Sequence, residues 1–210
     1  MKRLLLAGVV TAALIGAAVA QVNVVPQVGV TSSYLGKQTY SATWIALVPA
    51  ASGTDAVCIT GSATKVIRLQ NLKISGTATT AINLPMTILR RVTADTGGTP
   101  ATGTANPANT IAARDTGTAL ATAATATLVS YTANPTINDT SPTYIDSAYV
   151  NIGTSATSGV GYTFDFGKDN ANLLQPPTAR GAAQQICLNL NASSIGAAGT
   201  TVGSITWTEE

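Results

Sequence analysis

The sequence predicts an all-β fold: a jelly-roll-like antiparallel β-sandwich of about eight strands, after an N-terminal signal-like apolar helix. Three observations predict it. Polar and apolar residues alternate with period two in most segments, as in half-buried strands. Short runs rich in Gly, Thr, Ser and Pro separate these segments. After the first 20 residues, no segment has the 3.6-residue period of an amphipathic helix.

The stretch 57–91 is the densest part of this pattern, and it predicts three consecutive strands with tight connections. The first strand covers 55–60, and the second covers 65–75. The third begins at Ile82 and alternates cleanly to Ile88. Pro85 within it cannot donate a ladder hydrogen bond, so we expect this strand to lie at a sheet edge or to be locally broken.

The second of these strands changes parity halfway along. Its apolar residues move from one face, with Ile67 and Leu69, to the other, with Leu72 and Ile74. One extra residue restores a single apolar face. The sequence therefore predicts a β-bulge at Gln70 or Asn71.

The first 20 residues have the layout of a secretory signal peptide. Lys2 and Arg3 precede the apolar run 4–15, and small residues follow, with Ala18 and Ala20 in an A-x-A arrangement. We expect cleavage near Ala20 and a virion or exported (periplasmic or extracellular) location, with no stable membrane span once the signal is removed. The alternative is an uncleaved anchor.

The mature chain that this cleavage leaves carries no net charge. Without Lys2 and Arg3 it has nine basic and nine acidic residues, and only 10% of the whole chain is charged. An ordinary domain has about 25% charged residues. A neutral, weakly charged chain is a poor binder of polyanions, so we expect no nucleic-acid partner. Burial of its surface in a homo-oligomer is the simplest explanation of the composition.

The remaining segments complete one domain, 40–210, which follows an extended N-terminal arm, 21–39. A low-complexity loop rich in Thr, Ala and Gly is expected at 93–122. The other predicted strands are 40–48, 124–131, 145–152, 161–166, 183–190 and 204–209.

The first strand of the domain has apolar residues on both faces. Tyr40 and Trp44 share one parity, while Ile45 and Leu47 share the other. This pattern is typical of a central or interface strand. Trp44 and Trp207 are the candidate interface or ligand aromatics. For Trp44, packing in the core or at a subunit interface is favoured over a ligand platform, because an indole ring carries so much apolar area.

The two cysteines, Cys58 and Cys187, lie on the more polar faces of their strands. In an exported chain such a pair is a candidate disulfide. The alternative is two unrelated small core residues, because the sequence does not show that the two strands are adjacent.

Few residues can support catalysis. The chain has no histidine, which excludes Ser-His-Asp and Cys-His nucleophile systems and His-bearing zinc sites. The acidic residues fall mainly in turns, and Glu209 and Glu210 at the end of the chain are expected to be solvated. Asp165 and Asp169 fit no calcium-loop spacing, which favours a plain polar turn. We therefore expect no enzyme, no cofactor, no catalytic residue and no metal site.

The basic residues of the central stretch allow two interpretations. They are Arg68, Lys73, Arg90 and Arg91. Together they could form an anion patch. Solvated charges that protect strands from edge pairing are the favoured interpretation, because the chain has no basic excess.

An ordered set of short segments resembles a family of uncharacterised β-rich structural proteins of tailed phages and prophages. From about Tyr40 to the C-terminus these segments agree in order and spacing. They are 59–65 (ITGSATK), 74–79 (ISGTAT), 89–91 (LRR) with 97–99 (GGT), 131–136 (YTANPT), 164–167 (FDFG), 188–191 (LNLN) and 207–210 (WTEE). Members of that family begin without a signal peptide, so the leader is a departure.

The resemblance implies a virion-associated accessory or decoration subunit, with capsid or tail proteins as partners and a trimer as the favoured assembly. With the low charge and the two-faced first strand, it leads to the first hypothesis: a non-enzymatic structural protein that acts by self-association. The alternative is an exported β-sandwich module that binds carbohydrate or a cell surface. That module would need an exposed aromatic platform, for which the candidates are Trp44, Tyr144, Tyr149, Tyr162 and Trp207.

Overall fold

The computed structural model describes residues 38–100, 111–114, 124–155, 160–167, 176–196 and 199–210. These residues belong to one compact unit, Lys37–Glu210. The expected signal peptide and residues 21–37 of the expected arm lie outside the described residues. In the described part of the chain, no helix has the length and the apolar character that a membrane crossing requires.

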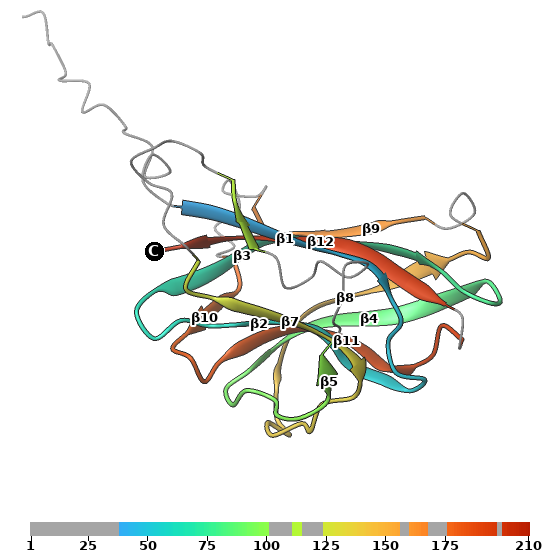
Figure 1. Ribbon diagram of the computed structural model, residues 1–210, viewed down its shortest axis with the longest axis horizontal. Coiled ribbons are helices and arrows are strands. Elements are labelled where there is room, and N and C mark those ends of the chain that lie inside the picture. The colour runs from blue at the N-terminus through green and yellow to red at the C-terminus, as the bar shows by residue number, and fades with distance from the viewer. Residues whose placement is uncertain (1–37, 101–110, 115–123, 156–159, 168–175, 197–198) are drawn as a thin grey trace, which may run out of the picture. The chain divides into compact units, whose positions relative to one another are not determined.

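The described chain folds as a β-sandwich of two antiparallel sheets, drawn as an upper and a lower layer in Figure 1. Sheet A has the order β10-β3-β12-β1-β6, and β9 pairs with β3 beside β10. Its strands are β1 (Gln38–Leu47), β3 (Val66–Thr77), β6 (Ile111–Ala113), β9 (Tyr162–Asp165), β10 (Thr178–Arg180) and β12 (Thr200–Glu209). This arrangement confirms the all-β antiparallel expectation.

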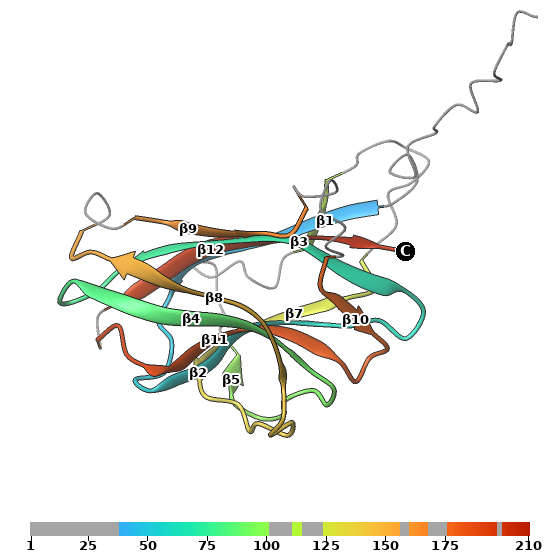
Figure 2. The same cartoon turned by 180° about the vertical axis from the view of Figure 1, so that it is seen from behind.

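Sheet B has the order β5-β7-β2-β11-β4-β8. Its strands are β2 (Gly53–Thr60), β4 (Ile82–Arg91), β5 (Thr99–Pro100), β7 (Thr127–Ala133), β8 (Thr143–Ile152) and β11 (Gln185–Ser193). Figure 2 shows β8 beside β4, at the edge of this sheet. Every strand predicted from periodicity overlaps one of the twelve strands found in the described residues.

The hydrophobic core lies between the two sheets. Sheet A contributes its large aromatic residues, with Tyr40, Trp44 and Trp207 all buried. Sheet B supplies aliphatic side chains such as Leu84 and Ile88 from β4. Each buried side chain of this size is worth about 1.5–3 kcal/mol of transfer free energy, so the inward parity of the strands drives the stacking of the two sheets.

The predicted bulge in β3 is confirmed. Asn71 pairs with Thr206 and Leu69 pairs with Trp207, so Gln70 is the extra residue. As a result Ile67 and Ile74 point into the same core despite their opposite parity in the sequence.

A second bulge, which the sequence did not predict, lies in β1. The register with β12 shifts between Trp44 and Leu47, and Ala46 has a positive φ of 54°. Trp44 and Leu47 are therefore both buried, whereas Ile45 turns outward. The expectation that Ile45 and Leu47 share a face was wrong for this reason. The expectation that β1 is central is confirmed, because it lies between β12 and β6.

Pro85 lies where β4 changes from an inner to an edge position. The ladder with β11 covers Thr87 to Arg91, and only β8 pairs with β4 from Ile82 to Met86. The edge expectation is thus correct for the half of β4 that contains Pro85 and wrong for the other half. Because no strand pairs with that half on the β11 side, the missing N–H breaks no ladder there.

The loop expected at 93–122 is not free of regular structure. It contains β5, which pairs with β7, and β6, which pairs with Tyr40 to Ala42 of β1. These strands of two and three residues are too short to produce a period in a Thr/Ala-rich sequence. Residues 101–110 and 115–123 of that loop lie outside the described residues.

Candidate functional site

The candidate disulfide is present. Cys58 and Cys187 face each other in the β2–β11 ladder, with their Cα atoms 4.1 Å apart, and they are disulfide-bonded. They lie on the outer face of sheet B, in a small second hydrophobic cluster with Leu89 and Tyr131. The cysteines were expected on the more polar faces of their strands. They do lie on the outer face of sheet B, but Leu89 and Tyr131 bury them there.

Trp44 and Trp207 are both fully buried in the core between the sheets. Trp207 stacks on Tyr40 with ring centroids 5.8 Å apart. Trp44 lies over Gly203, where a Cβ atom would come within 2.3 Å of the indole ring. Neither ring offers a face to a ligand or to a second copy. Both tryptophans are therefore core residues, and their interpretation as interface or ligand aromatics was wrong.

A buried ion cluster lies beside the disulfide, and the sequence did not predict it. Arg91 Nε donates to Asp55 Oδ2 at 2.5 Å and lies 3.5 Å from Asp95 Oδ1. Arg91 Nη1 also donates to the carbonyl oxygen of Asp139 at 2.7 Å. All four residues are buried, so Arg91 is not one of the solvated charges that the sequence favoured.

Polar side chains of β11 complete this cluster. Asn189 donates from Nδ2 to Asp55 Oδ1 at 2.5 Å. The backbone N–H of Asp95 donates to Gln185 Oε1 at 2.9 Å, and Gln185 Nε2 donates to Thr60. The cluster therefore ties the segment after β4 to the outer face of sheet B.

The cluster contains more negative than positive groups, and this perturbs its titration. Burial, together with the adjacent Asp55 carboxylate, raises the pKa of Asp95 to about 7, although Arg91 opposes the rise. Hydrogen bonds from the backbone N–H groups of Val92 and Ser141 lower the pKa of Asp139. Burial and the nearby Asp95 raise the pKa of the Tyr131 phenol.

The chemistry of the cluster favours a structural role. Donor atoms of Asp55, Cys58, Asp95 and Cys187 lie within 4.8 Å of one another, a spacing that could hold a metal ion. The two sulfurs are bonded to each other, however, and a disulfide is not a thiolate ligand. The guanidinium of Arg91 already occupies the carboxylates. Because all of these side chains are buried, the cluster has no route for a substrate.

Glu209 corrects another expectation. It was expected to be solvated, but it is buried. Its carboxylate accepts hydrogen bonds from the backbone N–H groups of Thr125 and Ala126, from the Thr125 hydroxyl at 2.6 Å and from Trp207 Nε1 at 3.2 Å. Burial alone would raise the pKa of Glu209, but these donors outweigh it and lower the pKa. Only Glu210 keeps a partly exposed side chain, 2.7 Å from Arg68.

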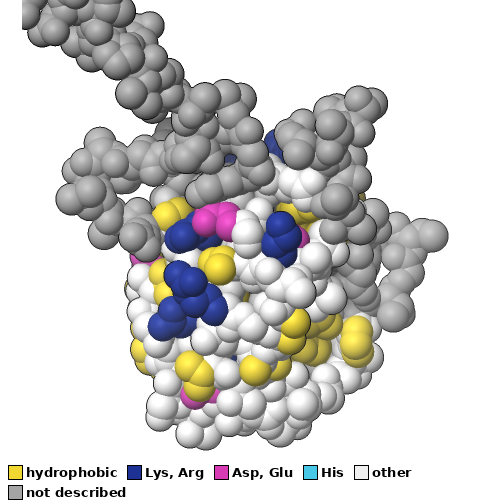
Figure 3. Space-filling view, turned by 90° about the vertical axis from the view of Figure 1, so that its left-hand side faces the viewer, with side chains coloured by type: hydrophobic (Ala, Val, Ile, Leu, Met, Phe, Trp, Pro, Cys, Tyr) yellow, Lys and Arg dark blue, Asp and Glu magenta, His cyan; other side chains and the backbone are white. Residues whose placement is uncertain are grey.

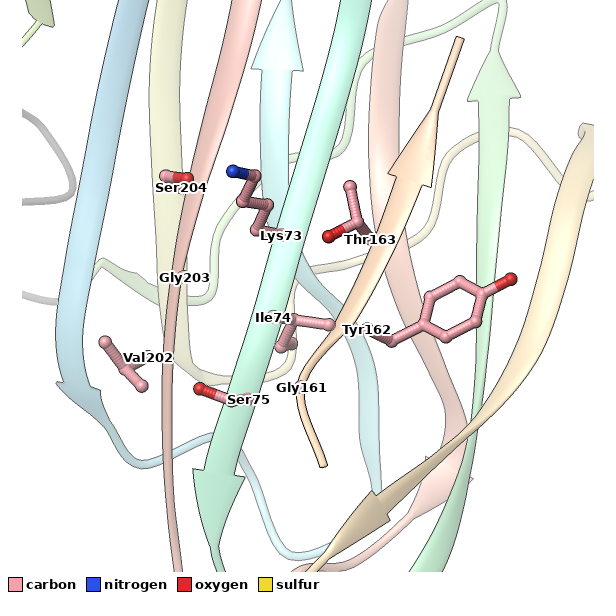
Figure 4. Close-up of a pocket in the computed structure, with 9 residues that line it drawn as sticks. All are labelled: Lys73, Ile74, Ser75, Gly161, Tyr162, Thr163, Val202, Gly203 and Ser204. Atoms are coloured by element: carbon pink, nitrogen blue, oxygen red, sulfur yellow. The ribbon is translucent and has the colours of Figure 1, made fainter. Parts of the chain in front are cut away.

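The outer face of sheet A carries two adjoining hollows. One, of about 370 Å³, has Ile45, Ala46 and Val202 as its apolar wall. The other, of about 360 Å³, is shown in Figure 4, where Lys73 extends toward Ser204 on one side and lies next to Thr163 on the other. Both hollows include Ser75 and Val202, so they form one groove with an apolar end and a polar end.

The outer face of sheet B carries a different pair of hollows, along β8. One is lined by Tyr144 and the other by Tyr149, and both include Thr87 and Ser147. These tyrosines are exposed by 70% and 74%, more than the other large apolar or aromatic side chains that the structure describes except Val160.

Charge is sparse on the surface as well as in the composition. Figure 3 shows the end of the domain that carries the C-terminus, where a few Lys and Arg side chains gather near acidic ones within a mostly uncharged surface. Asp165, one of the residues considered for calcium, accepts a hydrogen bond from the N–H of Gly167 in a local turn. Asp169 lies outside the described residues.

The fold and these surfaces define the class of the protein as an all-β antiparallel sandwich. Scans against protein-family models, curated proteins and solved structures each found no match. The resemblance to tailed-phage structural proteins therefore stays a prediction.

Proposed function

We propose that the chain is a non-enzymatic structural subunit with a jelly-roll topology that self-associates, as an accessory or decoration subunit of a virion. The strand order supports the jelly roll. Sheet A contains the run β9-β3-β12-β1, and sheet B contains β2-β11-β4-β8. The chain thus alternates between the sheets from β1 to β4, and again through β8, β9, β11 and β12, with the short β10 as a second consecutive strand of sheet A; this is the pattern of two interlocked Greek keys.

The observation that carries self-association is the outward position of Ile45. β1 contributes Tyr40, Ala42 and Trp44 to the core, so alternation places Ile45 on the outer face, where it is 52% exposed beside Val202, while the bulge at Ala46 turns Leu47 inward. Packing within the chain gives no reason for an isoleucine there. An apolar wall on the exposed face of a central strand is the kind of surface that a subunit interface buries.

The distribution of charge supports the same function. Four of the nine acidic residues, namely Asp55, Asp95, Asp139 and Glu209, are buried and thus unavailable to keep the surface hydrated. A mature chain without net charge and with so few exposed charges has little electrostatic resistance to association. The ion cluster supports the non-enzymatic part of the proposal, because its residues are buried and its carboxylates lie against the Arg91 guanidinium.

Self-association can be tested on the purified mature chain by light scattering coupled to size-exclusion chromatography. We expect an oligomer, with a trimer favoured by the resemblance, and we expect the double variant I45K/V202K to be monomeric. Two lysines on the apolar wall would have to be desolvated in the interface. The control is V92K, because Val92 is equally exposed but lies on the segment after β4. A wild-type chain that is monomeric throughout the accessible concentration range would refute self-association.

The virion and the leader can be tested together by peptide mass spectrometry. Particles purified on a density gradient and the cleared medium of the producing culture are digested, and the N-terminal peptide is determined. We expect peptides in the particle band and a chain that begins at Gln21. Recovery only in the cleared medium would overturn the virion assignment, and a Met1 start in the particles would overturn cleavage.

A further inference from the structure

The outer face of sheet B carries two exposed tyrosines in register on one side of the edge strand. Tyr144 pairs with Leu89 and Tyr149 pairs with Pro85 in the β8–β4 ladder. Leu89 belongs to the outer hydrophobic cluster of sheet B, and Pro85 has the same parity as Leu89, so both tyrosines face outward. They lie on the opposite outer face of the sandwich from Ile45.

A continuous groove joins the two rings. The hollow beside Tyr144 has a volume of about 400 Å³ and the hollow beside Tyr149 about 340 Å³. Because Thr87 and Ser147 line both, the hollows meet between the tyrosines. The groove is therefore an open channel with an aromatic ring at each end and hydroxyl groups in the middle.

The amide of Asn191 lines the end of this groove beside Tyr149, where hydrogen bonds hold it in place. Its Nδ2 donates to the Pro85 carbonyl oxygen at 3.2 Å and to Thr87 Oγ1 at 3.0 Å. Its backbone N–H donates to Asn189 Oδ1 at 2.7 Å. Asn191 and Ala192 both have positive φ, a conformation that costs free energy in residues other than glycine. The chain thus holds a strained turn whose amide is positioned before any ligand arrives.

The groove stands on a rigid support. Asn189, which orients Asn191, is itself held by Asp55 of the buried ion cluster. The Cys58–Cys187 disulfide links β2 to β11, the strand that carries both asparagines. A binding site on cross-linked strands loses little conformational entropy when a ligand binds.

The chemistry of the groove fits a neutral, hydroxyl-rich ligand. Tyrosine rings offer flat apolar faces for the C–H surfaces of pyranose rings, while Ser, Thr and Asn side chains exchange hydrogen bonds with hydroxyl groups. Asp146 is the one charged residue among the lining residues that the structure describes. Its carboxylate and the absence of a lining cation disfavour acidic ligands.

We propose that the groove between Tyr144 and Tyr149 is a binding site for a neutral polysaccharide, with the two rings contacting separate sugar residues of one chain. This site does not depend on self-association, because the wall around Ile45 is on the other sheet. Edge pairing with a second copy fits β8 less well. The strand is bulged near Ile145, where the register with β4 shifts, and the exposed Asp146 follows; both features hinder the addition of a strand.

The test is affinity electrophoresis of the mature chain in native gels at about pH 9.5, where loss of protons from the α-amino group and from part of the lysines gives the otherwise neutral chain a net negative charge. The gels contain hydroxyethyl cellulose, mixed-linkage β-glucan, xylan, mannan or dextran, and polygalacturonate serves as the acidic comparison. We expect retardation by at least one neutral polymer and none by polygalacturonate. Y144A and Y149A should each weaken binding by about tenfold, as removal of a central aromatic contact does, while Y144F and Y149F should retain it within about threefold. V160A is the matched control, because Val160 is exposed by 70%, as Tyr144 is, and lies outside both the groove and the wall around Ile45.

Three results would overturn the site. In the first, none of the five neutral polymers changes the mobility of the wild type. In the second, a polymer retards the double variant Y144A/Y149A as strongly as it retards the wild type. In the third, no polymer retards the wild type, and the double variant forms a smaller oligomer than the wild type does. The last result would make the groove an interface between copies. An unfolding midpoint of the double variant equal to that of the wild type would establish that it folds. Failure of I45K/V202K to dissociate an oligomer bears only on the self-association proposed above.

Discussion

Asp95 shows how a single carboxyl group can set the pH dependence of stability. Its pKa is raised to about 7 in the folded chain from an ordinary value of 3.8, so the folded state binds its proton more tightly than the unfolded state. The contribution is fully present below the unfolded pKa and is lost as pH rises through 7. Glu209 and Asp139, whose pKa values are lowered, remain ionised above pH 5 and do not interfere.

We therefore expect the free energy of unfolding to fall by about 1–3 kcal/mol between pH 5 and pH 8.5. Urea denaturation followed by tryptophan fluorescence at several pH values measures this change. Asp95→Asn should flatten the profile, since an amide does not titrate, whereas Asp165→Asn in an exposed turn should leave it as it is. If the free energy of unfolding of the Asp95→Asn variant fell with pH as steeply as that of the wild type, another group would be responsible for the pH dependence.

Single residues also show which kinds of information a sequence holds. The bulge at Gln70 could be predicted because parity is local: the apolar residues change face within one strand. The bulge at Ala46 could not, because the outward Ile45 looks like an ordinary apolar position. The Arg91 cluster was missed for another reason. Its partners Asp55 and Asp139 are far away in the sequence, and only the order of the strands brings them together.

At the scale of elements, the disulfide is the strongest single link within sheet B. Cys58 in β2 and Cys187 in β11 are 129 residues apart, so the bond closes most of the domain into one loop. In the chain-entropy view, a loop of that length destabilises the unfolded state by about 5 kcal/mol relative to the open chain. Removal of the bond should therefore lower stability more than most core truncations do.

The prediction is that C58A/C187A loses about 3–5 kcal/mol of unfolding free energy, and that a dithiol reductant destabilises the wild type but not the variant. Chemical denaturation with and without reductant measures both effects. Because both cysteines are buried in the folded chain, thiol titration is done on the denatured, unreduced wild type, where it should find no free thiol. Two titratable thiols there would contradict the cross-link.

Strands differ in how well the sequence reveals them. Long strands with one buried face, such as β3 and β4, impose a period that can be read directly. The short strands β5, β6 and β10 form because each pairs with the free edge of a neighbouring strand. The sequence of such a short segment does not show that this edge is available. For the same reason the adjacency of Cys58 and Cys187 needed the fold, although their residue type suggested the bond.

At the scale of the whole molecule, several of the few charged side chains are buried, where they link strands and sheets. The Arg91 cluster fastens one end of sheet B, and Glu209 links the two sheets. Glu209 ends β12 of sheet A, while Thr125 and Ala126 lead into β7 of sheet B. The described surface consists mostly of uncharged side chains, such as Thr, Ser and Asn, with a few apolar walls and few charges. That division explains how a weakly charged chain can form one stable unit and still present uncharged surfaces for association.

Glu209→Gln tests this link between the sheets. The amide keeps the shape of the side chain but weakens the hydrogen bonds from four donors, namely the Thr125 N–H and hydroxyl, the Ala126 N–H and the Trp207 indole N–H, so we expect a loss of about 1–3 kcal/mol at neutral pH. Because the pKa of Glu209 is lowered, its contribution is present above pH 4.5 and is lost as pH falls. Denaturant midpoints of wild type and variant should therefore converge in acid. Glu210→Gln, which removes the charge from a partly exposed pair with Arg68, should cost less than about 1 kcal/mol. Equal losses in the two variants would mean that Glu209 does not hold the sheets together more strongly than a surface ion pair does.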